Sequence, residues 1–80
     1  MTVQCFARLR ELAGAREWVC EVPAGATVAD VWAQLAGRAP AVSALASAVS
    51  CAVNAEFASM SAPVHDGDEV AFLPPVSGGA

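Results

Sequence analysis

The residues of this chain whose type and spacing could do chemistry lie at its C-terminus. Residues 74–80 read Pro-Pro-Val-Ser-Gly-Gly-Ala. Proline cannot extend a β-ladder, so we expect the last strand to end at Leu73. Gly78 and Gly79 lack a Cβ and can enter a passage too narrow for other residues. Extended, this arm would reach about 20 Å. It suits a terminal carboxylate that another enzyme activates; an ordinary frayed terminus is the alternative.

The other reactive side chains do not form a recognisable catalytic or metal-binding pattern. Cys5, Cys20 and Cys51 are widely spaced and contain no C-x-x-C pair, which is typical of buried thiols in a reducing compartment. His65 stands alone beside Asp66, and none of the serines has a histidine-based constellation around it. We therefore predict no metal site, no bound cofactor and no catalysis by this chain alone.

Composition limits the class of protein. The chain has 80 residues, of which 56% are hydrophobic and 15% charged, so we expect one folded domain. The net charge is −4, and arginine supplies all four basic residues, which argues against nucleic-acid binding. No apolar run approaches the roughly 20 residues of a membrane span. The N-terminus does not resemble a signal peptide, and we expect a cytoplasmic protein.

Hydrophobic periodicity predicts an α+β domain with a mixed sheet of about five strands on one main helix. The expected strands cover residues 2–8, 16–22, 50–54, 56–58 and 69–73. Three helical segments are expected. The first is a short turn at 9–13 that Gly14 stops, and the third is a weaker helix or turn at 41–49. Between them lies the main helix at 28–36, which Thr27 and Asp30 cap and Gly37 ends. The domain thus covers residues 1–73, and 74–80 form an extended, flexible tail.

The period of two in the strands also predicts which side chains face away from the helix. The inward face of the first strand should contain Val3, Cys5 and Ala7. Phe6 is out of phase with these residues, Leu73 is out of phase with its neighbours Val70 and Phe72, and Phe57 stands in a short strand. These three could form an apolar patch for a partner. Alternatively, they could close a second small core under residues 55–65.

Charged residues cluster at two places. Arg8 and Arg10 follow the first strand, where they could pair with Glu11 or Glu17 or contact a partner. The acids within residues 66–69 stand on a tight turn, Asp66-Gly67-Asp68, and lack the ligand pattern of a calcium loop. We expect them to shape the turn and to face basic groups of a partner.

Four motifs, in this order and at this spacing, resemble the MoaD family, the small subunit of molybdopterin synthase. They are FARLREL at 6–12, P-x-GATV at 23–28, AVN at 52–54 and DGDEVAFLPPVSGG at 66–79. The resemblance covers nearly the whole chain, and the last motif is highly specific. It implies a β-grasp fold similar to ubiquitin and to the ThiS sulfur carrier of thiamine synthesis.

The resemblance also implies a function. A MoeB-like activating enzyme would use ATP to adenylate the C-terminal glycine, and a sulfurtransferase would convert the adenylate to a thiocarboxylate. The tail would then enter a MoaE-like large subunit and deliver sulfur for the dithiolene of molybdopterin. Gly79 would be the acceptor and Gly78 would provide clearance. The implied partner-binding residues are Phe6, Phe57, Leu73, Pro74, Pro75 and Val76.

The sequence departs from the family pattern at Ala80 and Ala55. Ala80 follows Gly-Gly, so we expect it to be removed by a peptidase or to be foreign to the natural chain; otherwise the tail is not a standard sulfur carrier. Ala55 stands where the family often has glycine, and alanine is strained if the turn there needs a positive φ. Two alternatives stay open: a carrier for thiamine or cysteine synthesis, and a β-grasp interaction module with an inert tail.

Overall fold

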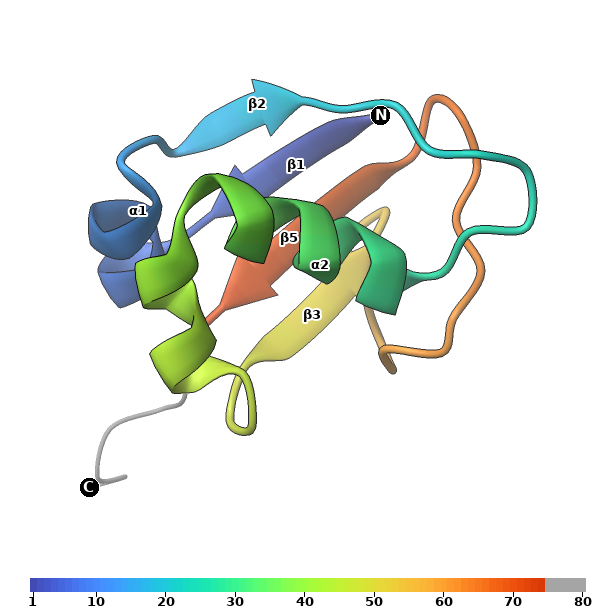
Figure 1. The fold of residues 1–80 in the computed structure, drawn as a ribbon. Coiled ribbons are helices and arrows are strands. Elements are labelled where there is room, and N and C mark those ends of the chain that lie inside the picture. Colours follow the sequence, from blue (N-terminus) through green and yellow to red (C-terminus); the bar gives the residue numbers. More distant parts are fainter. Residues whose placement is uncertain (75–80) are drawn as a thin grey trace.

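The computed structural model describes residues 1–74 of the chain as one sheet with helices on one side (Figure 1). The strands are β1 (Thr2–Cys5), β2 (Glu17–Val19), β3 (Ser50–Val53), β4 (Glu56–Ala58) and β5 (Glu69–Leu73). The helices are α1 (Ala7–Ala13), α2 (Val28–Arg38) and the 3₁₀ helix η1 (Pro40–Leu45). Within residues 1–74 no helix is both long and apolar enough to cross a membrane.

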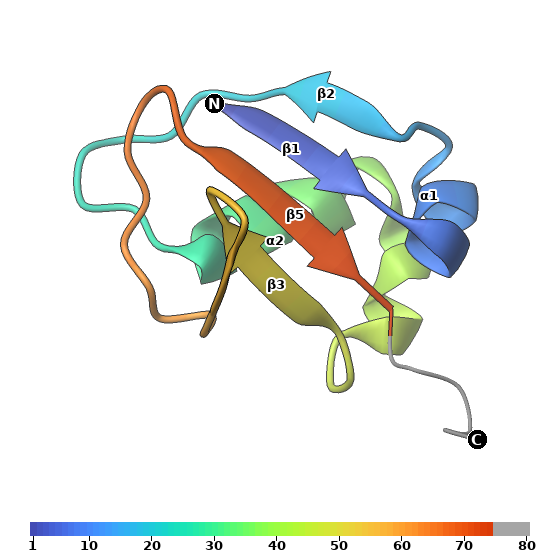
Figure 2. The ribbon, with the colours of Figure 1, turned by 180° about the vertical axis from the view of Figure 1, so that it is seen from behind.

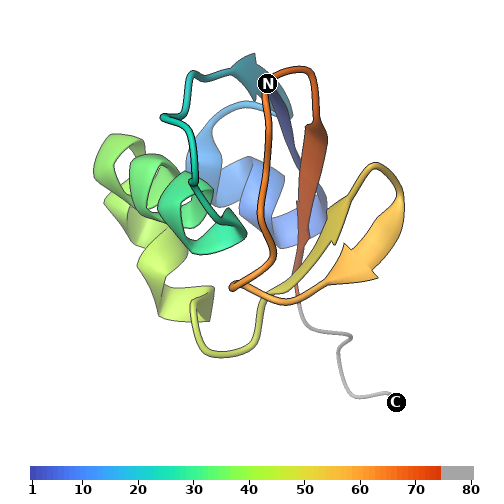
Figure 3. The same cartoon turned by 90° about the vertical axis from the view of Figure 1, so that its right-hand side faces the viewer.

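The strand order is β2-β1-β5-β3-β4. β1 and β5 are parallel, and the other neighbours are antiparallel. The helices form a second layer against one face of this sheet, as the view from the side shows (Figure 3). The expected α+β architecture, with a mixed five-stranded sheet on one main helix, is confirmed.

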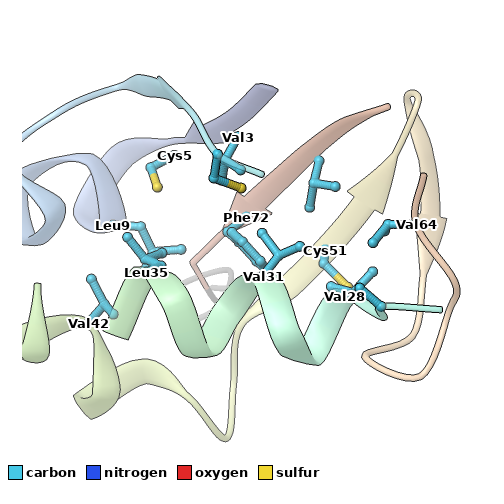
Figure 4. Packing of buried hydrophobic residues seen from close by; sticks show 13 residues of the cluster. Val3, Cys5, Leu9, Val28, Val31, Leu35, Val42, Cys51, Val64 and Phe72 are labelled. Atoms are coloured by element: carbon cyan, nitrogen blue, oxygen red, sulfur yellow. The ribbon is translucent and has the colours of Figure 1, made fainter. Parts of the chain in front are cut away.

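The core lies between α2 and the two central strands (Figure 4). One side of α2 contributes Val28, Val31 and Leu35, all buried. Strands β1, β5 and β3 contribute Val3, Cys5, Val70, Phe72 and Cys51. The ring of Trp32 packs edge-on against Phe72, with 5.0 Å between the ring centroids. The expectation that the two tryptophans serve packing agrees with this contact.

Helix α2 begins where the sequence predicts and ends later. The Asp30 carboxylate accepts hydrogen bonds from the backbone N–H of Thr27 at 2.8 Å and from its hydroxyl at 3.3 Å, which satisfies an end group of the helix. The expectation that Gly37 ends the helix is wrong, because α2 continues to Arg38. Pro40 supplies the actual stop, since the residue before a proline is driven out of the helical region, and Ala39 has a φ of −139° and a ψ of 79°.

The first strand is shorter than expected. It ends at Cys5, and Ala7 does not join the inward face but begins α1 with its side chain exposed. The physical reason is Leu9, which is fully buried: starting the helix at Ala7 turns Leu9 into the core. The predicted stop at Gly14 is confirmed, because Gly14 has a φ of 77° and its N–H donates to the Arg10 carbonyl.

The second strand is also shorter than the expected 16–22. Residues 17–19 pair with β1 in the antiparallel sense that the short connection predicts. The ladder pairs Thr2 with Val19, and the last bond runs from the Cys20 N–H to the Met1 carbonyl. Trp18, Cys20 and Val22 nevertheless pack inward, as the alternation predicts.

The C-terminal half agrees closely with the sequence. Strands β4 and β5 have the expected bounds, β3 ends one residue early at Val53, and η1 occupies the weak helical segment. Asn54 and Ala55 form the turn between β3 and β4 with φ values of 51° and 70°. Two positive φ values define a turn that favours Asn-Gly, so the alanine is strained there.

We predict that Ala55→Gly raises the free energy of unfolding by about 0.5–1 kcal/mol, because relief of strain exceeds the added entropy of the unfolded chain. Urea unfolding followed by circular dichroism measures this. Ala46→Gly is the matched control, since Ala46 has a φ of −54° and the same change there should destabilise the fold. Equal destabilisation by both changes would contradict backbone strain at Ala55.

Candidate functional site

The site is built around the end of the sheet at which β1 and β5 finish, which we call the exit end. Because the two strands are parallel, with Cys5 opposite Phe72, the chain leaves the sheet at the same place after both of them. The backbone N–H of Phe6 donates to the Phe72 carbonyl at 3.2 Å, which holds Phe6 beside Leu73. The residues that follow β5 therefore start next to Phe6.

Pro74 is the last residue that the structure describes, and it is half-buried. The other residues expected to do the chemistry or to guide the tail lie outside the described residues: Pro75, Val76, Gly78, Gly79 and Ala80. Their roles remain predictions. The structure thus establishes where the tail begins and which side chains surround its origin.

One face of the sheet is not covered by a helix, and we call it the open face (Figure 2). The register places one row of outward side chains across four strands, because Gln4 lies opposite Ala71, Ala71 opposite Ala52, and Ala52 opposite Phe57. Small residues in the middle of this row let another protein approach the backbone closely. Leu73 lies on the same face, two residues beyond Ala71 in β5.

The exposed fractions of Phe6, Phe57 and Leu73 distinguish an apolar patch for a partner from a second small core under residues 55–65. Phe57 is 81% exposed and Phe6 45% exposed, whereas Leu73 is half-buried. An exposed phenylalanine of this kind does not close a second core under residues 55–65. The structure therefore places these side chains where a partner could cover them, and their binding role itself stays a prediction.

Sequence reasoning missed two residues of this region. Val19, on the edge strand β2, is 72% exposed and faces the open side. The alternation with Glu17 and Glu21 was the signal that could have singled it out. Arg16 lines the same cleft as Arg10. It lies in the loop between α1 and β2, and no sequence pattern in that loop predicts that the two arginines share a cleft.

The three thiols are buried and unpaired, as expected. Burial raises the pKa of Cys5 to about 11, and it also raises the pKa values of Cys20 and Cys51. The Cys51 thiol lies 2.9 Å from the Ala58 carbonyl, within reach of a hydrogen bond. A thiol with a raised pKa is a poor nucleophile, so these cysteines do not suit sulfur transfer.

The acids of residues 66–69 shape their turn. The Asp68 carboxylate accepts hydrogen bonds from the Asn54 side-chain amide at 3.1 Å and from the His65 N–H at 2.8 Å. These bonds, led by the one from Asn54, lower the pKa of Asp68. Among residues 1–74 no three metal-ligating side chains come together. This turn lies at the end of the sheet opposite the exit end, since Glu69 begins β5.

Fold and site together define a ubiquitin-like β-grasp domain whose last strand, β5, ends beside an exposed apolar sheet face. The ThiS family model matches residues 3–79, and the chain belongs to the ThiS family. The match ends at Gly79, the residue before Ala80.

Curated relatives and solved structures agree with this family. The chain is 38% identical over 77 residues to the molybdopterin synthase sulfur carrier subunit of Arabidopsis thaliana, covering 96% of this chain and 80% of the relative. It is 36% identical over 87 residues to small archaeal modifier protein 1 of Haloferax volcanii, covering 99% and 100%. A crystal structure of that protein superimposes with a TM-score of 0.85 at 34% identity over 96% of each chain.

We predict that none of the three native thiols reacts readily with a thiol reagent at neutral pH. A pKa near 11 for Cys5 means about a hundredfold less thiolate than in the unfolded chain. Ellman's reagent, with and without denaturant, measures the rates. Ser47→Cys, at an exposed position, provides the control for an accessible thiol. A native cysteine that reacts as fast as this control would reopen a cysteine-based mechanism.

Proposed function

We propose that this chain is the sulfur-carrier subunit of a molybdopterin synthase. The observation that carries the proposal is the ThiS family match, which runs through the Gly78-Gly79 pair, together with relatives named for this role. The chain end is the reacting group, and the folded domain presents it. This division is consistent with the burial of all three thiols among the described residues.

The chemistry requires two steps at the Gly79 carboxylate, the first at the phosphorus of ATP and the second at the carbonyl carbon. In the first, a carboxylate oxygen attacks the α-phosphorus of ATP in the activating enzyme, and pyrophosphate leaves. In the second, a persulfide sulfur from a sulfurtransferase attacks the acyl carbon and AMP leaves, after which a thiol reduces the acyl disulfide to the thiocarboxylate. Adenylation matters because it turns a poor acyl electrophile into a good one.

The partners follow from this chemistry: a MoeB-like activating enzyme, a sulfurtransferase and a MoaE-like large subunit that receives the tail. The open face with Phe57 and the exit end with Phe6 and Leu73 offer the contact surface. ATP is consumed by the activating enzyme and is not held by this chain. We place the protein in the cytoplasm, where ATP and reduced thiols are available.

A second candidate is a protein modifier, which would attach its activated C-terminus to amines of other proteins. The similarity to small archaeal modifier protein 1, in sequence and in structure, favours it. Both candidates need the same adenylated glycine. They differ in the final acceptor, which is sulfur in one and an amine in the other.

The proposed carrier role predicts a specific change in mass. Protein recovered from its native cells should have lost Ala80 and exchanged one oxygen for sulfur. In a reconstituted reaction with ATP, activating enzyme and sulfur donor, the chain that ends at Gly79 should gain sulfur, whereas the chain that retains Ala80 should not. Covalent attachment to other proteins would favour the modifier. An unmodified mass for both forms would point to an inert interaction module.

We further predict that Phe57→Ala weakens binding to the large subunit by roughly tenfold, because an aromatic anchor is lost. The unfolding free energy should change by less than about 0.5 kcal/mol, since Phe57 is 81% exposed. Isothermal titration calorimetry and thermal unfolding measure the two effects. Ser47→Ala, at an exposed position outside the sheet, is the control. Loss of folding without a separable loss of binding would refute the role of Phe57.

A further inference from the structure

A cleft opens at the exit end, where β1 passes into α1. Its volume is about 130 Å³, and its lining includes Gln4, Phe6, Ala7, Arg10, Arg16 and Glu17. Arg10 and Arg16 also line a second cleft of about 250 Å³, together with Glu11, Gly14 and Ala15. Two guanidinium groups therefore share one concave surface next to an exposed phenylalanine.

The ion pairs of this region leave these two arginines available. Arg8 pairs with Glu11, with 3.4 Å between the Nη1 and Oε1 atoms, as one sequence expectation has it. Glu17 accepts a hydrogen bond from the Gln4 side chain at 3.2 Å. Within residues 1–74 no carboxylate lies within 4.0 Å of Arg10 or Arg16. The cleft thus holds two positive charges and one carboxylate that is already engaged.

The backbone at the cleft is strained. Ala7 has a φ of 50°, and this conformation costs an alanine about 1 kcal/mol or more. The turn at Ala7 lets α1 start at once after the extended Phe6, and α1 contributes Arg10 to the cleft. Strain of this kind persists where the surrounding structure requires the geometry.

The charge distribution is uneven along the molecule. Residues 7–17, which follow β1 at the exit end, contain three arginines and two glutamates. Residues 18–74 contain one arginine and six acids. A partner that accepts the chain end therefore meets a locally positive surface on a protein that is otherwise negative. Complementarity at this place requires negative charge on the partner.

We propose that Arg10 and Arg16 together bind a carboxylate side chain of the protein that receives the tail. The inference rests on the proposed function, because that function brings a protein to the exit end. Guanidinium groups bind carboxylates through paired hydrogen bonds, and the partner would also cover Phe6 and so exclude water from the ion pair. The contact orients the carrier so that β5 points at the channel for the tail.

The test compares two double variants that remove the same total charge. Arg10→Ala with Arg16→Ala removes both cleft arginines, and Arg8→Ala with Arg38→Ala removes two arginines that do not line it. Binding of the whole chain to the large subunit and to the activating enzyme of the source organism is measured by calorimetry at two salt concentrations. Thermal unfolding verifies that each variant is folded.

We expect the cleft variant to lose about thirtyfold in affinity for the large subunit and the control variant less than about threefold. Equal losses for the two variants, or no loss for either, would overturn the inference while leaving the proposed function intact. If the unaltered chain binds neither protein, the proposed function fails, and the inference fails with it. Shifts of the arginine NMR signals on adding millimolar phosphate or AMP alone would show that the cleft binds a free anion. That result would overturn the proposal that it binds a carboxylate side chain of the partner.

Discussion

The parallel pairing of β1 with β5 is the constraint on which the rest of the structure depends. It joins the first and the last strand of the domain at the centre of the sheet, with four residue pairs in register. Val3 and Val70 are paired and fully buried, as are Cys5 and Phe72. Since both strands end at the same edge, the start of α1 and the start of the tail are neighbours. A hydrogen-bond ladder thus sets where the chain leaves the sheet after β5.

The two faces of the sheet have different tasks. The face under α2 holds the buried core, and no polar or charged side chain is buried among the described residues. The open face presents small residues and exposed phenylalanine, which contribute little to folding. Stability and recognition are therefore physically separate in this small domain. A domain of this size has a thin core, so this separation lets the recognition surface vary without unfolding the protein.

Charged groups and thiols also occupy separate parts of the domain. Acids gather around the turn before β5, where Asn54 and His65 fix Asp68 by hydrogen bonds. Unpaired arginines stand at the other end, beside the origin of the tail. The thiols of the chain are withdrawn into the core, so the protein that is proposed to carry sulfur keeps its own sulfur atoms out of the reaction. In the proposed function the reactive group is the terminal carboxylate, and the fold would contribute position and partner contacts.

The sequence by itself determined the elements whose signals are local. Thr27 with Asp30, the Gly14 stop, the turn at Asn54 and the period of two in β5 each act within a few residues, and the motif ending in Gly-Gly indicated the family. Tertiary structure decided what depends on distant neighbours. β1 ends at Cys5 because Leu9 must reach the core, and the bounds of β2 follow from its register with β1, in which Thr2 lies opposite Val19. Arg10 and Arg16 share a cleft because the strained Ala7 turns the chain, and no local pattern encodes that meeting.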